Sequence, residues 1–171
     1  GAENRGSMKR MGGIPLALLF LAWPLPILAQ VAPSFGEASG YTGLLAAAAR
    51  GDASQIEALT AKGLKADVRD GHGRTPLHVA AYGGRHKAMR VLVAAGADPN
   101  ALERDRYDIV TIAAVANDLE TLEIALTLGG SAKNITSPYE GTALIAAAHL
   151  GHRDHVAVAI EYPASLRREM A

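Results

Sequence analysis

Three histidines near the end of the sequence have the spacing that most resembles a metal site. His149, His152 and His155 follow one another at intervals of three residues in HLGHRDH. Side chains three residues apart share one face of a helix, and imidazole nitrogens are common zinc ligands. The interval from 149 to 152, however, crosses an expected turn between two helices. We therefore expect these histidines to act as capping and surface residues and predict no metal.

The other motifs that could carry chemistry also give no sign of a catalytic site. The glycine-rich GHGR at 71–74 falls in an expected hairpin tip, where it would not cradle a phosphate, and NIT at 134–136 matches a glycosylation acceptor by chance. The sequence contains no nucleophile elbow, zinc-protease motif or phosphate-binding loop. We predict no catalytic residue, no cofactor and no enzymatic activity.

A structural role suits the stretch GRTPLHVAA at 73–81. Thr75 is placed to cap a helix through its hydroxyl group, and Pro76 fits the first helical position, where no N–H is needed. Leu77 is expected in the core, and the imidazole of His78 is placed to bridge neighbouring backbone groups. Ala80 and Ala81 would let adjacent helices approach closely.

This stretch is one copy of a repeat. Segments starting at Thr42, Thr75, Asp108 and Thr142 share an alanine-rich helix and a tight turn, and they are 33, 33 and 34 residues apart. A second amphipathic helix follows each turn, and three of these helices end at Gly63, Gly96 and Gly129, where glycine adopts a left-handed cap without strain. In the third copy, we expect Asp108 to cap its helix and Asn117 to accept left-handed backbone.

A period of 33 residues with two helices and a polar hairpin resembles the ankyrin repeat, most closely over 70–101. The resemblance implies an all-α solenoid of four helix–turn–helix repeats with β-hairpin loops. It also implies structural roles for Thr75, Pro76, Leu77, His78 and Gly96. Each repeat alone could not bury its apolar face, so stacking must supply the core.

Composition agrees with closely packed helices. Hydrophobic residues make up 49% of the chain but aromatic residues only 5%, so small apolar side chains dominate. The formal net charge is zero, which gives no support for binding to nucleic acid. The chain contains no cysteine, which fits an exported protein of a bacterial periplasm.

The N-terminal part is typical of a secretory signal peptide. A basic start at Met8–Arg10 precedes an apolar run near 14–28 and the small residue Ala29. The alternative is a membrane anchor, but the apolar run is only about 15 residues long and contains three prolines. Residues 1–7 are read as an added remnant or an over-extended reading frame. We thus expect no stable membrane anchor and a periplasmic or secreted protein.

These boundaries divide the chain into a signal peptide at 8–29, a linker at 30–39 and an ankyrin-repeat domain at 40–171. The repeats are expected at about 40–69, 70–102, 103–136 and 137–163, with one extra residue in the hairpin before the last helix pair. Pro163 stands where a cap glycine is expected, and we attribute the apolar last helix to truncation, a shifted frame or burial against a partner.

The family resemblance implies binding through the concave face formed by hairpin tips and inner helices. Tyrosine and arginine are frequent hot-spot residues in protein interfaces. We place on this face Tyr41, Arg74, Tyr82, Arg104, Arg106, Tyr107, Tyr139 and His149.

The leading function is a non-catalytic, monomeric module that binds another protein in the bacterial envelope. The resemblance to exported ankyrin-repeat proteins suggests stress defence or protection of an enzyme. The alternative is an inhibitor or immunity protein that neutralises a specific toxin or enzyme.

Overall fold

The computed structural model describes residues 32–136 and 141–154. The predicted signal peptide, Tyr139 and most of the expected last helix lie outside these residues. The secondary-structure elements in the described ranges are all α-helices. None of these helices combines the length and hydrophobicity that crossing a membrane requires.

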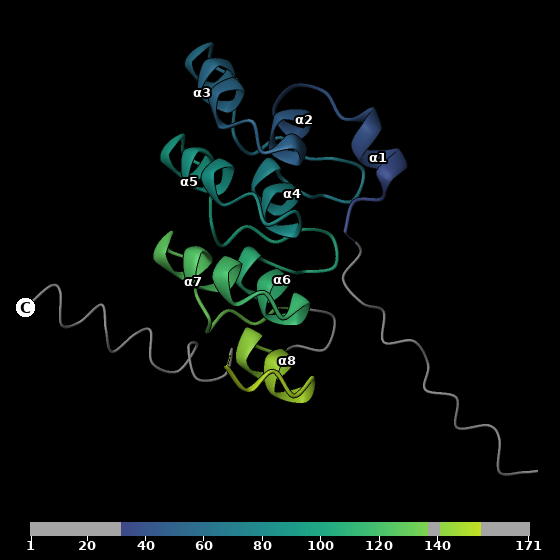
Figure 1. Ribbon diagram of the computed structural model, residues 1–171, viewed down its shortest axis with the longest axis vertical. Coiled ribbons are helices and arrows are strands. Elements are labelled where there is room, and N and C mark those ends of the chain that lie inside the picture. The colour runs from purple at the N-terminus through teal and green to yellow at the C-terminus, as the bar shows by residue number, and fades with distance from the viewer. Residues whose placement is uncertain (1–31, 137–140, 155–171) are drawn as a thin grey trace, which may run out of the picture.

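The helices form two parallel columns (Figure 1). The inner column contains α2 (Gly43–Arg50), α4 (Pro76–Tyr82), α6 (Ile109–Ala116) and α8 (Ala143–His149), and each of these helices packs against the next. The outer column contains α3 (Ala53–Ala61), α5 (His86–Ala94) and α7 (Leu119–Thr127), each paired with the inner helix that precedes it. The helix pairs therefore follow the repeat seen in the sequence.

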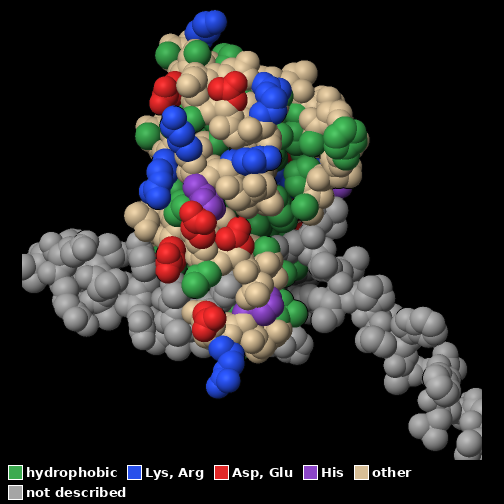
Figure 2. All heavy atoms as spheres, in the orientation of Figure 1, with side chains coloured by type: hydrophobic (Ala, Val, Ile, Leu, Met, Phe, Trp, Pro, Cys, Tyr) green, Lys and Arg blue, Asp and Glu red, His purple; other side chains and the backbone are tan. Residues whose placement is uncertain are grey.

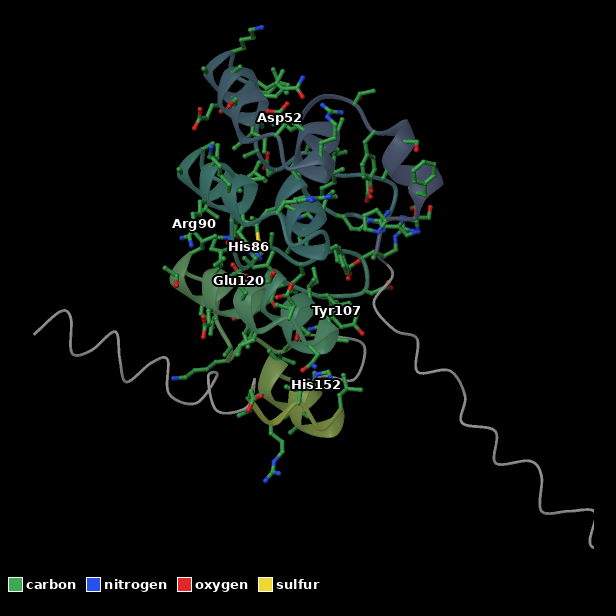
Figure 3. The ribbon with its side chains drawn as sticks, viewed as in Figure 1. Asp52, His86, Arg90, Tyr107, Glu120 and His152 are labelled. Carbon is green, nitrogen blue, oxygen red and sulfur yellow. The ribbon has the colours of Figure 1, made fainter. Side chains whose placement is uncertain are left out.

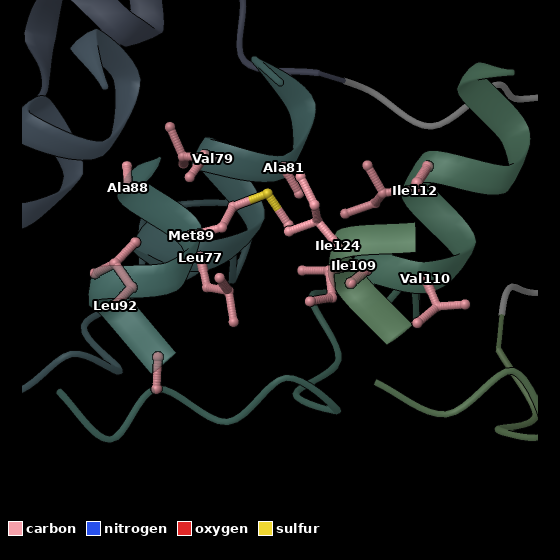
Figure 4. Close-up of a cluster of buried hydrophobic side chains, with 14 of the residues drawn as sticks. Leu77, Val79, Ala81, Ala88, Met89, Leu92, Ile109, Val110, Ile112 and Ile124 are labelled. Atoms are coloured by element: carbon pink, nitrogen blue, oxygen red, sulfur yellow. The ribbon is translucent and has the colours of Figure 1, made fainter. Parts of the chain in front are cut away.

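Alanine determines how closely the inner helices stack. Ala47, Ala80, Ala113 and Ala147 occupy the same position of successive repeats, and each is at most 1% exposed. A methyl side chain loses no rotamer freedom on burial and lets helix backbones approach. On the outer column, Met89 and Leu92 of α5 are fully buried, and Met89 belongs to the same buried cluster as Ile124 of α7 (Figure 4).

Helix ends follow the capping chemistry that the sequence predicts. Asp108 accepts a hydrogen bond from the N–H of Thr111 at 2.8 Å, which confirms its capping role. Asn117 ends α6 with φ of 56°, which confirms the predicted left-handed residue. Gly63, Gly96 and Gly129 follow the ends of the outer helices with φ near 90°.

The connections differ from the predicted β-hairpin loops. Within the described residues, each turn closes on a hydrogen-bonded pair without an extended strand: Asp70 N to Arg74 O, Glu103 N to Tyr107 O, and Thr136 N to Gly141 O. The last pair spans one residue more than the others, as expected from the extra residue before Thr142. We call the segments that these pairs close, 70–74, 103–107 and 136–141, the hairpin tips; of the last segment, the structure describes only Thr136 and Gly141.

A short helix that the sequence did not indicate precedes the stack. Helix α1 (Phe35–Gly40) occupies part of the expected linker. Ser34 caps it by accepting from the N–H of Glu37, whose carboxylate accepts from the N–H of Ser34 in return. α1 contains no buried residue, so side-chain bonds to its neighbours must hold it in place.

Candidate interaction surface

Hydrogen bonds tie the first two hairpin tips to each other. The N–H of Arg104 donates to the carbonyl of His72 at 3.0 Å, and the Arg104 guanidinium reaches the carbonyl of Gly71. Arg69 donates to the carbonyl of Leu102 at 2.8 Å. The first two tips therefore form one continuous edge rather than separate loops.

Arg74 lies in the interior, not on a partner-facing surface as the sequence suggested. Its side chain is 1% exposed, with Nε 2.7 Å from Asp70 Oδ2 and Nη2 2.7 Å from Glu37 Oε1. The hydroxyl of Tyr41 donates to the same Asp70 oxygen at 2.6 Å. We call Glu37, Tyr41, Asp70 and Arg74 the tip network, and it fastens α1 to the first hairpin tip.

Hydrogen bonds lower the pKa of both carboxyl groups in the tip network. Burial opposes ionisation of Asp70, but hydrogen bonds from Tyr41 and Arg74 outweigh it and lower the pKa to about 2. The Ser34 backbone and hydroxyl, followed by Arg74, lower the pKa of Glu37 to about 2. Both groups are therefore ionised at neutral pH beside a permanent cation.

Tyr107 is also buried, which corrects its predicted place on the surface. It is 6% exposed and lies two residues before the start of α6 (Figure 3). Its N–H donates to Glu103 Oε1 at 3.1 Å, and its carbonyl accepts from His78 Nε2 at 3.1 Å. Tyr107 thus joins the second hairpin tip to the inner column.

The other predicted partner-binding residues have different environments. Tyr41 and Tyr82 are half-buried, and Arg104 and Arg106 are exposed. In the described part of the chain, the Tyr82 hydroxyl has no hydrogen-bond partner, whereas that of Tyr41 is bound to Asp70. The side chains of Tyr139 and His149 lie outside the described residues.

Thr75 and His78 form a reciprocal cap at the start of α4. The His78 N–H donates to Thr75 Oγ1 at 3.4 Å, and the Thr75 N–H donates to His78 Nδ1 at 3.1 Å. Nδ1 is therefore an acceptor and Nε2 carries the proton, which it shares between the carbonyls of Ala101 and Tyr107 at 2.9 and 3.1 Å. Burial lowers the pKa of His78 to about 4, so the ring is neutral at pH 7.

The other residues predicted to have structural roles, Pro76, Leu77 and Gly96, occupy positions that fit such roles. Pro76 begins α4, Leu77 is fully buried, and Gly96 follows the end of α5 with φ of 96°. His152, considered above with His149 and His155, hydrogen-bonds through Nδ1 to the carbonyl of Ala114 at 2.8 Å. Within the described residues, no three His, Asp or Glu side chains come together in a group that could hold a metal ion.

Sequence reasoning missed two sets of residues that stabilise this region. One is the series of acids Glu37, Asp70 and Glu103, which could have been found from its 33-residue spacing. The other is Asn100, whose Oδ1 accepts from the Ser131 N–H at 2.9 Å and from Asn134 Nδ2 at 2.8 Å. Asn134 also donates to the buried cap Asp108.

The outer column has a different character from the tips. His86 of α5 contacts Glu120 and Thr121 of α7, with its Nε2 2.7 Å from the Thr121 hydroxyl (Figure 3). Charges of both signs are interspersed on the face shown in Figure 2, with carboxylates gathered over α7. Such a mixed surface favours no single class of charged ligand.

Comparison with known proteins relates this architecture to others. Residues 21–103 match the family model described as ankyrin repeats (3 copies). The chain is also 31% identical over 118 residues to the E3 ubiquitin-protein ligase KEG of Arabidopsis thaliana. That similarity covers 64% of the chain, which spans about 7% of the length of this relative.

Proposed function

We propose that this chain binds another protein through its hairpin tips and inner helices, because residues 21–103 match the model of ankyrin repeats, which act as protein–protein interaction modules. The continuous edge of tied tips is the observation that supports this proposal most strongly. Fixed tips lose little conformational entropy when a partner docks. In this role the repeats act as a rigid, non-catalytic solenoid.

The groups available for contact lie on the second tip and beside it. Arg104, Asp105 and Arg106 are exposed, and Tyr82 presents a half-buried ring whose hydroxyl is not bound within the described residues. Arginine and tyrosine provide large contact areas together with hydrogen-bond donors. Arg74 and Tyr107 contribute indirectly, since they hold the tips in place.

Site-specific photocrosslinking in the source cells tests this function. A photoreactive amino acid at position 106 should give a discrete adduct with one partner. The same group at Ala94, exposed on outer helix α5, serves as the matched control and should give none. Adducts from position 94 alone would place binding on the outer column, and no adduct from either position would contradict a binding module.

We further propose that the protein acts as a monomer in the bacterial envelope, in stress defence or the protection of an enzyme. The support is the basic and apolar pattern of residues 8–29 and the absence of cysteine from the sequence. Terminal sequencing of the protein recovered from the periplasm should find Gln30 as the first residue. Recovery in the cytoplasm with residues 8–29 intact would contradict this location.

A further inference from the structure

Acidic residues recur at one position of the 33-residue period. Glu37, Asp70 and Glu103 are 33 residues apart, and Thr136 follows after the same interval. Residues four positions later form a parallel series of Tyr41, Arg74 and Tyr107. The chain therefore provides three carboxylates but only one cation in these two series.

The single cation serves the first two carboxylates. Arg74 contacts its own Asp70 and, through a second nitrogen, Glu37 of the preceding position. Tyr41 supplies Asp70 with a further hydrogen bond. Both acids thereby share one counter-charge within the chain.

Glu103 lacks such a partner. It is 7% exposed, and its carboxylate accepts one hydrogen bond, from the Tyr107 N–H to Oε1. Among the ion pairs of the described residues, none involves Glu103, although Arg104 and Arg106 belong to the same tip. A buried carboxylate without a counter-charge carries an uncompensated desolvation cost.

The surroundings of Glu103 suit a cation from outside the chain. Its charge and that of Asp105 act on Tyr82, where burial, followed by Glu103, raises the pKa of the phenol. Tyr82 lies at the end of α4, half-buried, with a hydroxyl that is not bonded in the described residues. An aromatic ring attracts cations through its face, and the negative charges that act on Tyr82 add to this attraction.

We propose that Glu103 and Tyr82 receive an arginine side chain presented by the partner protein. The inference rests on the proposed function and adds the chemistry of the partner. Arg74 is the template, because one repeat earlier it shows a guanidinium joining two carboxylates through two nitrogens. A lysine ammonium lacks this planar fork and stacks less well on a tyrosine ring.

Short peptides test the site without knowledge of the partner. The full chain, labelled with ¹⁵N, is titrated with N-acetyl-Gly-Arg-Gly-amide and with the same peptide containing citrulline, which keeps the shape of arginine but is uncharged. The arginine peptide should shift the amide signals of residues 82, 103 and 107 in a saturable way, with a dissociation constant on the order of millimolar. The citrulline peptide should shift them at least fivefold less. Equal shifts with both peptides would overturn the proposal.

Two variants locate the binding charge. Glu103→Gln should abolish the saturable shifts, whereas Glu57→Gln, which removes an exposed carboxylate from α3, should leave them unchanged. Shifts that persist in Glu103→Gln would refute the site. The citrulline comparison uses the unaltered chain, so it decides the question even if Glu103→Gln fails to fold.

The two proposals fail in different ways. Crosslinking from position 106 without an arginine-dependent titration would keep the binding face and reject arginine recognition. A positive titration without any crosslinked partner would keep the cation site and reject the protein-binding function.

Discussion

The imidazole of His78 stays neutral because both of its nitrogens are already engaged. Nδ1 accepts from the Thr75 N–H, and Nε2 donates to two carbonyls of the next hairpin segment. Protonation would place a hydrogen on Nδ1, where a donor already points, and would bury a charge. The residue that joins α4 to the second tip therefore also makes the fold sensitive to acid.

Acidification should weaken the fold through this residue. The folded pKa of about 4 lies below the ordinary value of 6.5, so the stabilisation is complete above pH 6.5 and is lost as pH falls towards 4. By linkage, the free energy of unfolding should fall by about 2 kcal/mol between pH 7 and pH 4.5. Urea denaturation across this range measures the slope. In His78→Gln this part of the slope should vanish, and an unchanged slope would assign it to other groups.

Removal of the Arg74 side chain should destabilise the chain rather than merely weaken binding. Arg74→Ala leaves Asp70 and Glu37 without their shared cation, which should cost about 2–4 kcal/mol of unfolding free energy. Arg74→Lys should cost less, since it keeps a charge but cannot reach both carboxylates in the same way. Thermal denaturation compares the variants, and a fully stable Arg74→Ala would mean that the buried network contributes nothing.

At the scale of elements, the helix pairs could be predicted from the sequence because the residues that begin and end each helix recur from repeat to repeat. Thr75 with Pro76, the cap Asp108 and the glycines at 63, 96 and 129 each mark a helix end by local chemistry, independent of distant contacts. Helix α1 escaped prediction because six residues with two glycines have little helix propensity of their own. Instead, α1 is stabilised by its capping box and by the tip network, which depends on residues more than 30 positions away.

Leu92 tests the phase assigned to the outer helices. It is fully buried in α5, so Leu92→Ala should lower the free energy of unfolding by about 2–5 kcal/mol. Leu64, which is 40% exposed, is the matched control, and Leu64→Ala should cost well under half as much. Chemical denaturation measures both, and similar losses in the two variants would be inconsistent with this packing.

Arg106 tests backbone strain in the second tip. Its φ is 63°, whereas the corresponding position of the first tip is Gly73 with φ of 74°. Arg106→Gly should raise stability by about 0.5–1 kcal/mol, because glycine adopts this conformation without a Cβ clash. Asp105→Gly, at a neighbouring position without positive φ, should not stabilise. A loss of stability in Arg106→Gly would show that its side chain contributes more than the strain costs.

At the scale of the whole molecule, the period locates the tips but not the direction of their side chains. That is why Arg74 and Tyr107 could be placed on a tip from sequence and yet were wrongly expected at its surface. Their burial depends on α1 and on the neighbouring repeat. The candidate face was therefore predictable as a region, while the residues that present contacts on it had to come from the structure.

Unequal burial along the stack should appear in amide hydrogen exchange. Residues 76–81 of α4 are all buried between neighbouring helix pairs, whereas α1 has no buried residue. The α4 amides should exchange only through large-scale unfolding, and the α1 amides should exchange many times faster through local opening. Glu37→Gln should accelerate exchange in α1 and leave α4 unchanged. Equal protection in both helices would contradict attachment by side chains alone.

The position of both tip charges within one period has a consequence for how such a chain could lengthen. A duplicated copy of residues 70–102 would bring an Asp70 and an Arg74 together, so every added unit would carry its own acid and its own base. Growth by duplication of this unit would leave no new charge unmatched inside the molecule. Duplication of residues 103–135 would instead add a carboxylate without a cation, and each copy would offer one more vacant position to an incoming basic side chain.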